Sequence, residues 1–525
     1  MNFSDYPYLW LIILVVILFF MVRLAVGYYA SRKVQTAADY VVAGRRLPIY
    51  LTGASIMATW FAAETLMGAS ATAYQWGFQG VLFDPFGAVI CLFLSGFFFI
   101  RILRRARYMT AIDFFEKRFG KKMAVAGAIA QIIAYFGWTA AQIVAGGAIV
   151  HALLGIPIYW GMIFVTTVVV LYTLMGGMWA DTLLDFMQMF FSAAGILLIF
   201  FAVMRQVGGW DVFVSTASTA FVDNPFQLMP SADSGFLGYE GFHGWIYWVA
   251  AIFSIGLGSL PAQDLMQRSM SAKNEATAVH GTYLAAILYG GFGILSPLVG
   301  IAMYHLLPGL GPQQTEYLIV SAAVNYLNPL LAALFVAALA SALMSTSDSS
   351  ILAGASIVTE NILPSVRKNL TEKQKLFWTR GMVVVIGLFS LGLALFAATI
   401  YKLAIFAWTV LLVGQVAPFV LGIYWKKANQ KGALWGYLAG FVGWLVCMFI
   451  FYQTTMPANP GDLETALWDA AYMGSVPGFF ISLLVLVAVS ILTQKSDPPK
   501  PMLDVDDQPL ILYKRLGWLK PKDVL

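Results

Sequence analysis

Six consecutive polar residues, Ser345 to Ser350, interrupt an apolar stretch that extends from Leu330 to Val358 and is long enough to cross a bilayer. Five of the six carry hydroxyl groups, and the sixth, Asp348, carries a carboxylate. Polar and charged groups at membrane depth are costly unless they line a cavity or bind a ligand, so such a cluster marks a candidate functional site. Oxygen ligands without a nearby His or Cys suit a hard cation. The run therefore predicts a cation site within the membrane.

Helical spacing divides this run into two overlapping sets. Ala342, Ser345 and Thr346 are spaced i, i+3 and i+4, so they share one face of a helix. Ser345, Asp348 and Ser349 repeat this spacing one turn later. A single Ser or Thr in a membrane helix often bonds to the carbonyl four residues earlier. Five hydroxyls beside an Asp favour a ligand instead.

The composition requires a membrane protein. Hydrophobic residues make up 60% of the 525 residues and charged residues only 11%, which excludes a soluble globular chain. Apolar runs of about 20 residues predict thirteen membrane spans. They lie at residues 9–31, 48–74, 79–101, 123–152, 156–176, 181–204, 242–263, 277–305, 318–358, 376–398, 400–425, 432–453 and 470–493. The span at 318–358 is too long for one straight helix, so we expect it to combine a helix with a turn or an intracellular extension.

Basic residues predict the orientation in the bilayer. With the N-terminus outside, 29 of the 31 Lys and Arg residues lie on the cytoplasmic side or at cytoplasmic helix ends, and only Arg205 and Lys402 lie outside. The positive-inside rule therefore predicts N-out, C-in topology, with residues 494–525 as a cytoplasmic tail. In so apolar a chain these basic residues are topology signals, and a nucleic-acid partner is not expected.

Motifs for ATP-driven transport and for covalent catalysis are missing from the sequence. It contains no Walker A motif, no G-x-G-x-x-G and no G-x-S-x-G. Cys91 and Cys447 both lie in predicted spans, and the four His residues lack any metal-ligand spacing. An enzyme is therefore not expected, and transport driven by an ion gradient remains.

Two of the predicted spans contain helix-breaking residues. The second carries small residues between Gly53 and Gly68, and the seventh carries SIGLGSLPAQ at 254–263. Secondary transporters place their sites where such paired helices are broken near the middle of the membrane. Five spans separate the first of the pair from the second, as an inverted five-plus-five repeat requires. Unwinding would free the carbonyls of Ala58 and Phe61 for a cation.

Four motifs carry a resemblance to a known family. They are AGRRLPIYLTGASIMATWFAAETLMGASATAY, GGMWADTLLDFMQ, QDLMQRSMSAKNEATA and ALMSTSDSS. Together they resemble the sodium/solute symporter family, from about residue 10 to residue 490. The resemblance implies an all-α polytopic membrane protein with the five-plus-five inverted repeat of the amino-acid-transporter-like fold, one extra helix before it and two after. It also implies a single transporter domain over residues 1–493, with core repeats at about 46–205 and 240–425.

The resemblance further implies a sodium site between the broken second span and the hydroxyl run. Its ligands in the family are two carbonyls at the break, and one carbonyl and two hydroxyls from the later helix. The matching positions are Ala58, Phe61, Ala342, Ser345 and Thr346. Some members have a second sodium site, which Asp185, Ser345, Asp348 and Ser349 match. Leu184 and Asp348 depart from the residues of other members, so one sodium ion is expected and a second is left open.

Two acids lie four residues apart near the predicted start of the sixth span. Asp181 is interpreted as an acid that the positive end of the helix dipole favours. Asp185 lies deeper, so it is expected to bind the ion or to regulate its release.

Three segments most resemble the high-affinity choline transporter branch of this family: ATW at 58–60, FGWTAAQ at 136–142 and STSDSSIL at 345–352. Aromatic faces hold quaternary ammonium groups by cation-π attraction. The expected substrate contacts are Trp60, Glu64, Trp138, Gln142, Gln263, Phe406 and Trp408. Ala262 and Ala404 stand where that branch has further tryptophans, and the nearby Phe406 and Trp408 could replace them.

Glu64 is a second departure, because the choline branch has Gly at this position and sugar-carrying relatives have an acid. The carboxylate beside two tryptophans could neutralise an organic cation or accept a hydrogen bond from a polar solute. The alternative is that Glu64 only pairs with a backbone donor of the broken helix.

The resulting hypothesis is a sodium-coupled symporter that imports a small organic solute by alternating access, with choline or another small cation or zwitterion as the solute. We expect a multi-pass protein of the cell membrane, in a bacterial inner membrane, whose partners are the solute, sodium ions and the lipid bilayer. Alternatives are a symporter for proline-like amino acids, sugars or monocarboxylates, or a membrane sensor, although the tail is too short for a kinase domain. The oligomeric state is left open.

Overall fold

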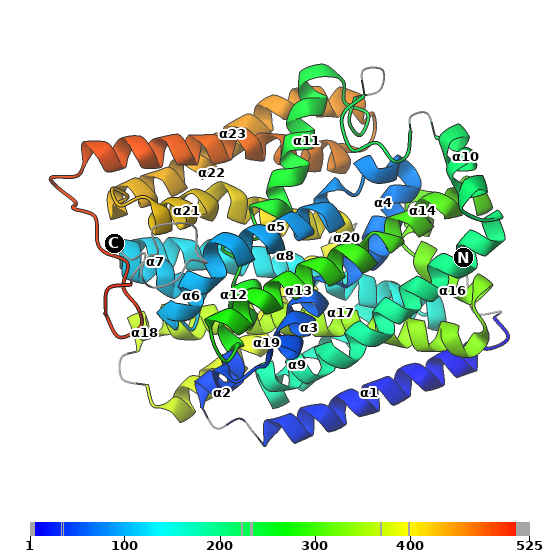
Figure 1. Ribbon diagram of the computed structural model, residues 1–525, viewed down its shortest axis with the longest axis horizontal. Coiled ribbons are helices and arrows are strands. Elements are labelled where there is room, and N and C mark those ends of the chain that lie inside the picture. Colours follow the sequence, from blue (N-terminus) through cyan, green and yellow to red (C-terminus); the bar gives the residue numbers. More distant parts are fainter. Residues whose placement is uncertain are drawn as a thin grey trace.

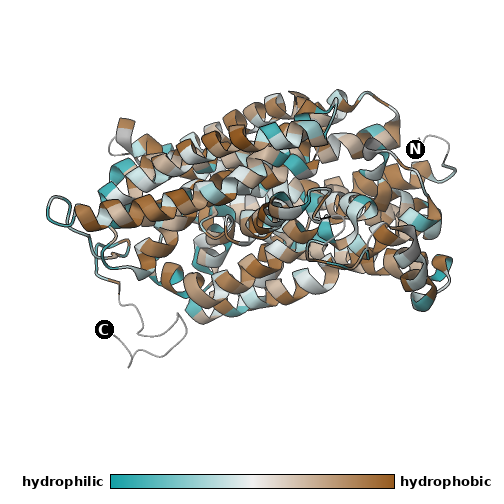
Figure 2. Ribbon diagram, turned by 90° about the horizontal axis from the view of Figure 1, so that it is seen from above, coloured by the Kyte–Doolittle hydropathy of each residue, from teal (hydrophilic) through white to brown (hydrophobic). Residues whose placement is uncertain are grey.

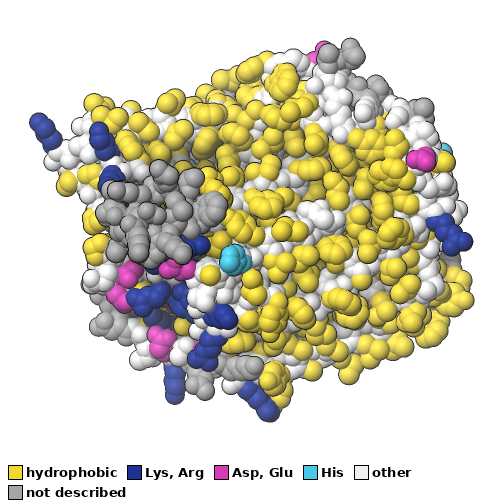
Figure 3. Space-filling view, in the orientation of Figure 1, with side chains coloured by type: hydrophobic (Ala, Val, Ile, Leu, Met, Phe, Trp, Pro, Cys, Tyr) yellow, Lys and Arg dark blue, Asp and Glu magenta, His cyan; other side chains and the backbone are white. Residues whose placement is uncertain are grey.

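The computed structural model of this chain is a bundle of helices that run mostly along its long axis (Figure 1). The structure describes residues 6–32, 34, 36–221, 224–231, 235–367, 370–396 and 400–510. Within these ranges there are isolated β-bridges but no β-strand. Hydrophobic residues are spread along the helices and cover most of the visible side of the bundle, as contact with lipid requires (Figures 2 and 3).

Eleven helical segments in the described ranges are long and apolar enough to cross a membrane. Each of them matches one of the thirteen predicted spans. The two predicted spans without such a segment are 48–74 and 242–263, in which the helices are interrupted and therefore short. The number of spans and the boundaries of the two repeats stay predictions.

The second predicted span is broken in its middle. Helix α3 (Ile49–Trp60) is followed by two non-helical residues, a π-type turn (Ala63–Gly68) and helix α4 (Ala69–Trp76). Ala62 has φ −136° and ψ −131°, and its N–H donates to the carbonyl of Trp60 instead of the carbonyl of Ala58. The break therefore withholds from the Ala58 carbonyl the donor that a continuous helix would supply.

The seventh predicted span is interrupted as well. Six residues separate the end of helix α11 (Gly241–Gly256) from the start of helix α12 (Gln263–Ser271). A Cβ atom on Gly258 would lie 2.1 Å from the carbonyl oxygen of Ser254 and 2.3 Å from that of Trp408. Only Gly allows the backbone of the break to approach helix α20 (Ile400–Leu411) so closely.

The long predicted span at 318–358 is a helix, a turn and a second helix, as expected. Helix α16 (Leu318–Tyr326) ends before Asn328, whose side chain caps helix α17 (Pro329–Ile357) by accepting from the N–H of Leu331. Helix α17 is central to the molecule, and every residue of the hydroxyl run on it is buried.

Helix α9 (Ile158–Val207) contains two predicted spans joined by a kink. Gly177 lies at the kink with φ 50°, and a Cβ there would lie 2.6 Å from the carbonyl oxygen of Tyr40. The chain continues through this kink as one helix. Asp181 and Asp185, which follow the kink, therefore do not lie at a free helix end.

The remaining helices surround these elements. They are α1 (Leu9–Ser31), α2 (Ala37–Val42), α5 (Ala88–Leu94), α6 (Ile100–Ala106), α7 (Ala111–Phe119), α8 (Lys121–Leu154), α10 (Trp210–Ala220), α13 (Glu275–Gly293), α14 (Leu295–Leu306), α15 (Pro312–Thr315), α18 (Leu363–Val366), α19 (Glu372–Phe396), α21 (Ala417–Tyr424), α22 (Gln430–Ala458) and α23 (Leu463–Leu492). Helix α1 lies along one edge of the bundle, and the pair α22 and α23 lies along the opposite edge (Figure 1).

Helix α1 begins at the right end of the bundle in Figure 1, and helix α23 finishes towards the left end. Most of the Lys and Arg side chains visible in Figure 3 gather at the left end. After α23, the chain folds back over this end: the N–H of Val505 donates to the Ala106 carbonyl (3.1 Å), and Arg118 donates to the Lys500 carbonyl (2.7 Å). Of the predicted tail at 494–525, residues 511–525 lie outside the described ranges.

Candidate functional site

The hydroxyl run on α17 contacts five different helices, one of which is α12, whose Arg268 donates to Ser349. Successive residues of a helix point in directions about 100° apart, so six polar residues in a row must meet several neighbours. Ser345 and Ser349 face α9, Thr346 faces the end of α3, Asp348 faces α1 and Ser350 faces α8. The run is therefore a junction between helices that are distant in the sequence.

The first predicted sodium set lies where α17 passes the break after α3. The Thr346 hydroxyl donates to the carbonyl of Thr59 at 2.8 Å, next to the Ala58 carbonyl. Ala342 lies one turn earlier on the same face of α17 and is buried. Ser345 turns its hydroxyl towards α9. The structure thus brings Thr346 to the broken helix and places Ser345 between the two predicted sets.

Asp185 of α9 is the centre of the second predicted set. Its carboxylate accepts from the hydroxyl of Ser345 (2.6 Å) and from that of Ser55 on α3 (2.5 Å). Ser55 was not among the predicted site residues, although it lies one helical turn before Ala58. Its hydroxyl links α3 to the carboxylate that the sequence singled out.

Asp181 is not the helix-start acid that the sequence suggested. It is buried, accepts from Ser345 (3.0 Å) and Ser349 (2.9 Å), and forms an ion pair with Arg268 of α12 at 2.5 Å. The interpretation fails because α9 runs on through the kink at Gly177, so that Asp181 lies inside the bundle and not at a solvated helix start.

Asp348 is paired with a residue that the sequence reading assigned to a cytoplasmic helix end. The guanidinium of Arg23 on α1 donates to its carboxylate at 2.6 Å, and the hydroxyl of Thr173 on α9 donates to its other oxygen at 2.7 Å. The signal that could have identified Arg23 is a positive charge eight residues inside an otherwise apolar span.

Three tryptophans form a second cluster beyond the break. The ring centroids of Trp60 and Trp408 are 5.9 Å apart, and those of Trp138 and Trp408 are 4.9 Å apart. All three side chains are buried. The structure therefore brings together three of the four aromatic residues predicted to contact the substrate.

Buried acids hold the indole N–H groups of this cluster. The N–H of Trp138 donates to Glu64 at 3.0 Å, and the amide of Gln142 donates to the other oxygen of Glu64 at 2.6 Å. The N–H of Trp60 donates at 2.6 Å to Asp264, an acid that the sequence reading missed although it directly follows Gln263. Both carboxylates thus lie at the edge of the aromatic cluster.

Two predicted substrate contacts lie elsewhere. The Phe406 ring packs against Trp468 and Trp444, with centroid distances of 5.2 and 6.0 Å. Gln263 accepts from the N–H of Ala111 at 2.6 Å, near the basic end of the bundle. Phe406 and Gln263 therefore make these contacts with residues outside the cluster of Trp60, Trp138 and Trp408.

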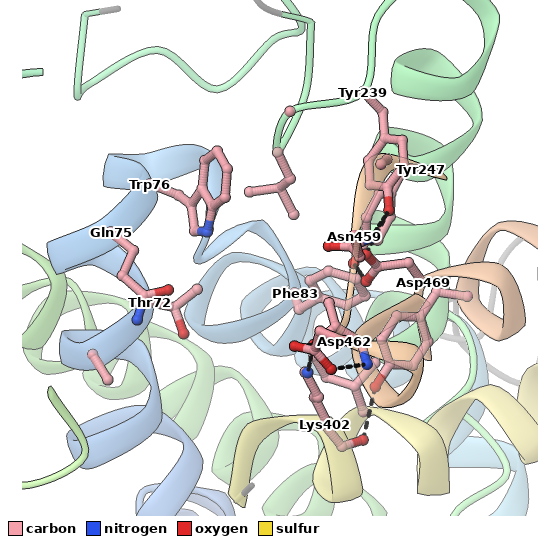
Figure 4. A pocket seen from close by; sticks show the side chains of 18 of the residues that line it. Thr72, Gln75, Trp76, Phe83, Tyr239, Tyr247, Lys402, Asn459, Asp462 and Asp469 are labelled. Carbon is pink, nitrogen blue, oxygen red and sulfur yellow. Dashed lines mark hydrogen bonds between the residues drawn. The ribbon is translucent and has the colours of Figure 1, made fainter. Parts of the chain in front are cut away.

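A cavity of about 570 Å³ lies where α4 ends and α20 begins. Figure 4 shows Thr72, Gln75 and Trp76 on one side of it, across from Tyr239, Tyr247 and Asp469. Ile405 lines the cavity, and Trp408 follows three residues later on the same helix. The cavity therefore stops about one helical turn short of the tryptophan cluster.

The cavity is acidic. Among the described residues that line it, Glu316, Asp462, Glu464 and Asp469 are acids and Lys402 is the only Lys or Arg. Burial raises the pKa of Glu316 to about 7, so this side chain is only partly ionised near neutral pH. Hydrogen bonds from Thr465, with Lys402 nearby, hold the pKa of Asp462 below its usual value. A cleft of one charge sign concentrates ions of the opposite sign, here cations.

The described ranges contain no group of three or more His, Cys, Asp or Glu side chains that could hold a metal ion. A transition-metal centre is therefore not indicated there. The hydroxyl and carbonyl oxygens at the α3 break are instead of the type that hard cations prefer.

Residues 40–440 match the model of the sodium:solute symporter family. The osmoregulated proline transporter of Bacillus subtilis is 26% identical over 496 residues, covering 91% of this chain and 94% of that protein. The high-affinity choline transporter 1 of Torpedo marmorata is 25% identical over 451 residues, covering 82% of this chain and 75% of that protein.

A solved structure of a Na+-coupled sialic acid symporter in its substrate-bound outward-open state has a similar fold. The TM-score is 0.78 with 21% sequence identity, and the match covers 95% of this chain and all of that one. At this level of identity the similarity shows a common fold and leaves the solute open.

Proposed function

Since this chain belongs to the sodium:solute symporter family, we propose that the solute it carries with sodium is a small organic cation or zwitterion, with choline as the first candidate. Sodium-coupled symport across a membrane is the activity of the family. Which solute is carried depends on the residues of this chain.

One observation carries the proposal: three buried tryptophan rings meet beside two buried carboxylates. Quaternary ammonium groups are attracted to aromatic faces, most strongly to Trp. Glu64 and Asp264 add negative charge at the edge of the rings while they fix the indole N–H groups of Trp138 and Trp60. The acidic cavity that stops one turn away would gather the same class of solute.

We propose that sodium binds Ala58, Phe61, Ala342, Ser345 and Thr346. In support, the Thr346 hydroxyl already contacts the backbone of the break, and Ala58 lacks its helical donor. Sodium at this position would tie α3 to α17 and favour the state that faces outside. Opening to the cytosol, where sodium is scarce, would release it.

The orientation that this cycle requires is N-out and C-in. It is supported by the gathering of Lys and Arg at the end where the described chain finishes (Figure 3). In this orientation the acidic cavity faces the outside, where sodium and the solute are taken up.

The proposal is tested by thermal unfolding of the purified protein with candidate solutes, each in sodium and in potassium buffer. The panel contains choline, betaine, proline, glucose and a monocarboxylate. A ligand at 100 times its Kd raises the free energy of unfolding by about 2.7 kcal/mol, which is a measurable rise in the melting temperature. Stabilisation by choline or betaine in sodium alone is the expected result. Stabilisation by glucose or a monocarboxylate alone would refute the proposed class.

Paired substitutions on α20 test whether the tryptophan cluster binds the solute. Trp408→Leu removes a ring that contacts Trp60 and Trp138, and we expect about a tenfold rise in the KM for choline, because a cation-π contact in a dry site is worth about 1 to 2 kcal/mol. Phe406→Leu is the matched control, and we expect the KM for choline to stay within about twofold. Sodium-driven uptake into proteoliposomes measures both values. If both substitutions changed the KM for choline equally, the tryptophan cluster would not be the solute site.

A further inference from the structure

Arg23 places a positive charge in the interior of the membrane-spanning part of the molecule. It lies within the apolar span Leu9–Ala30 of α1, yet its side chain is only 3% exposed. Its guanidinium donates to Asp348 (2.6 Å) and to the carbonyl of Ser341 (2.6 Å), and it lies 4.7 Å from the centroid of the Tyr172 ring. Charged residues at such depth are rare and usually functional.

This pairing conflicts with the second predicted sodium set. Both oxygens of Asp348 already accept strong donors, from Arg23 and from Thr173. The hydroxyl of Ser349 donates to Asp181 and accepts from Arg268. Two of the four predicted ligands, Asp348 and Ser349, are thus held by guanidinium groups, and the set does not fit a sodium ion.

The buried charged groups around Asp185 have a net charge that one small monovalent cation would neutralise. Three carboxylates, Asp181, Asp185 and Asp348, are matched by two guanidiniums, Arg23 and Arg268, and none of the five is more than 3% exposed. Buried charges are tolerated when they are paired and hydrogen-bonded. In ionised form the group carries one net negative charge, which lies nearest Asp185 because Arg268 is 3.7 Å from it and 2.5 Å from Asp181.

We infer that Arg23 and Arg268 are tethered cations that take the place of a second sodium ion, so that this chain binds one sodium ion per transport cycle. The inference rests on the proposed sodium coupling, and it specifies the stoichiometry. Arg23 is the decisive residue, because its only ion-pair partner in the described ranges is Asp348. Arg268 is shared between Asp181 and Asp185.

A purely structural role for Arg23 predicts a different result from the tethered-cation role. A structural residue would change stability when it is replaced, without changing the number of sodium ions bound. A tethered cation, once neutralised, would leave Asp348 free to recruit sodium. Counting bound sodium therefore separates the two roles, and the count needs no knowledge of the solute.

The experiment is equilibrium binding of radiolabelled sodium to the purified full-length protein. The wild type is expected to bind about one sodium ion per chain, and Arg23→Gln about two, because the substitution removes the positive charge and keeps hydrogen-bond donors. Arg23→Lys keeps the charge and should bind about one. The double variant Arg23→Gln with Asp348→Asn removes both charges and should also bind about one.

Two sodium ions bound by the wild type would overturn the inference, as would one bound by a folded Arg23→Gln variant. If Arg23→Gln does not fold, a count of two sodium ions in the wild type or in the double variant still overturns the inference. A wild type that binds one sodium ion but transports none of the candidate solutes would refute only the proposed solute. A wild type that binds no sodium would refute the sodium site itself.

Discussion

Replacing Ser345 and Thr346 together by Ala is expected to abolish sodium-dependent uptake. Both hydroxyls belong to the proposed sodium site, and the Thr346 hydroxyl also bonds to the carbonyl of Thr59 at the break. Two oxygen contacts to a cation, at about 1.5 kcal/mol each, correspond to about a 100-fold loss of sodium affinity. Uptake of the identified solute into proteoliposomes, measured over a range of sodium concentrations, gives this value.

The chain supplies a matched control for this experiment in the adjacent residue. Ser347 lies in the same run, but its hydroxyl donates only to the carbonyl of Leu343 in its own helix, at 2.8 Å. Ser347→Ala removes a hydroxyl of the same kind and depth, and we expect its sodium dependence to stay within about twofold of the wild type. If the variant Ser345→Ala with Thr346→Ala kept full sodium-dependent uptake, these two hydroxyls would not be sodium ligands.

The second large effect is expected at Glu64. Glu64→Gln removes the charge beside the tryptophans, while the new amide oxygen can still accept from Trp138 or from Gln142. We expect the affinity for choline to fall about 10- to 100-fold, since a charged partner in a buried site is worth about 1.5 to 3 kcal/mol. Sodium binding in the absence of solute should be unchanged. Competition binding of choline to the purified protein measures the effect.

Glu360→Gln is the matched control, because Glu360 is a carboxylate near the end of α17 whose Lys375 partner lies 3.7 Å away, outside both proposed sites. The affinity of this variant for choline should equal that of the wild type. If choline bound equally well to Glu64→Gln, Glu64 would be a packing partner of Trp138 and Gln142, as in the alternative weighed from the sequence.

The sequence predicts those parts of the fold that depend on local chemistry. Gly and Pro residues locate the break between α11 and α12, and small residues between two Gly residues locate the break after α3. Apolar length locates the eleven helical segments in the described ranges that are long enough to cross a membrane. In each case the signal is the property of one segment, which can be read without knowing what lies beside it.

Partners across helices are harder to predict. Phe406 and Trp408 look equivalent in sequence, but residues two apart on a helix point to nearly opposite faces. Trp408 therefore meets Trp60 and Trp138, whereas Phe406 meets Trp468. Periodicity tells which residues share a face, and it does not tell which neighbour that face meets.

The partner of the charged residue Arg23 could not be predicted from the sequence either. Long basic side chains near the end of a span often extend towards the interface. Sequence reasoning therefore counted Arg23 with the cytoplasmic charges. Its true surroundings, Asp348 of α17 and Tyr172 of α9, come from segments more than 140 residues away. Only tertiary packing brings them together.

In their ionised form, the five buried groups carry one unmatched negative charge, and this charge has a consequence for the response to voltage. When the carrier is empty, its return towards the outside moves this negative charge, together with those of Glu64 and Asp264, through part of the transmembrane field. Moving one elementary charge across the whole membrane at a potential of about 100 mV changes its free energy by about 2.3 kcal/mol. With the inside negative, this potential favours the return of a negative charge towards the outside. One bound sodium ion cancels the charge, so the loaded step is electrically silent at this site. Voltage should therefore govern how fast the empty carrier resets, and steady-state currents should saturate with hyperpolarisation once loading becomes limiting.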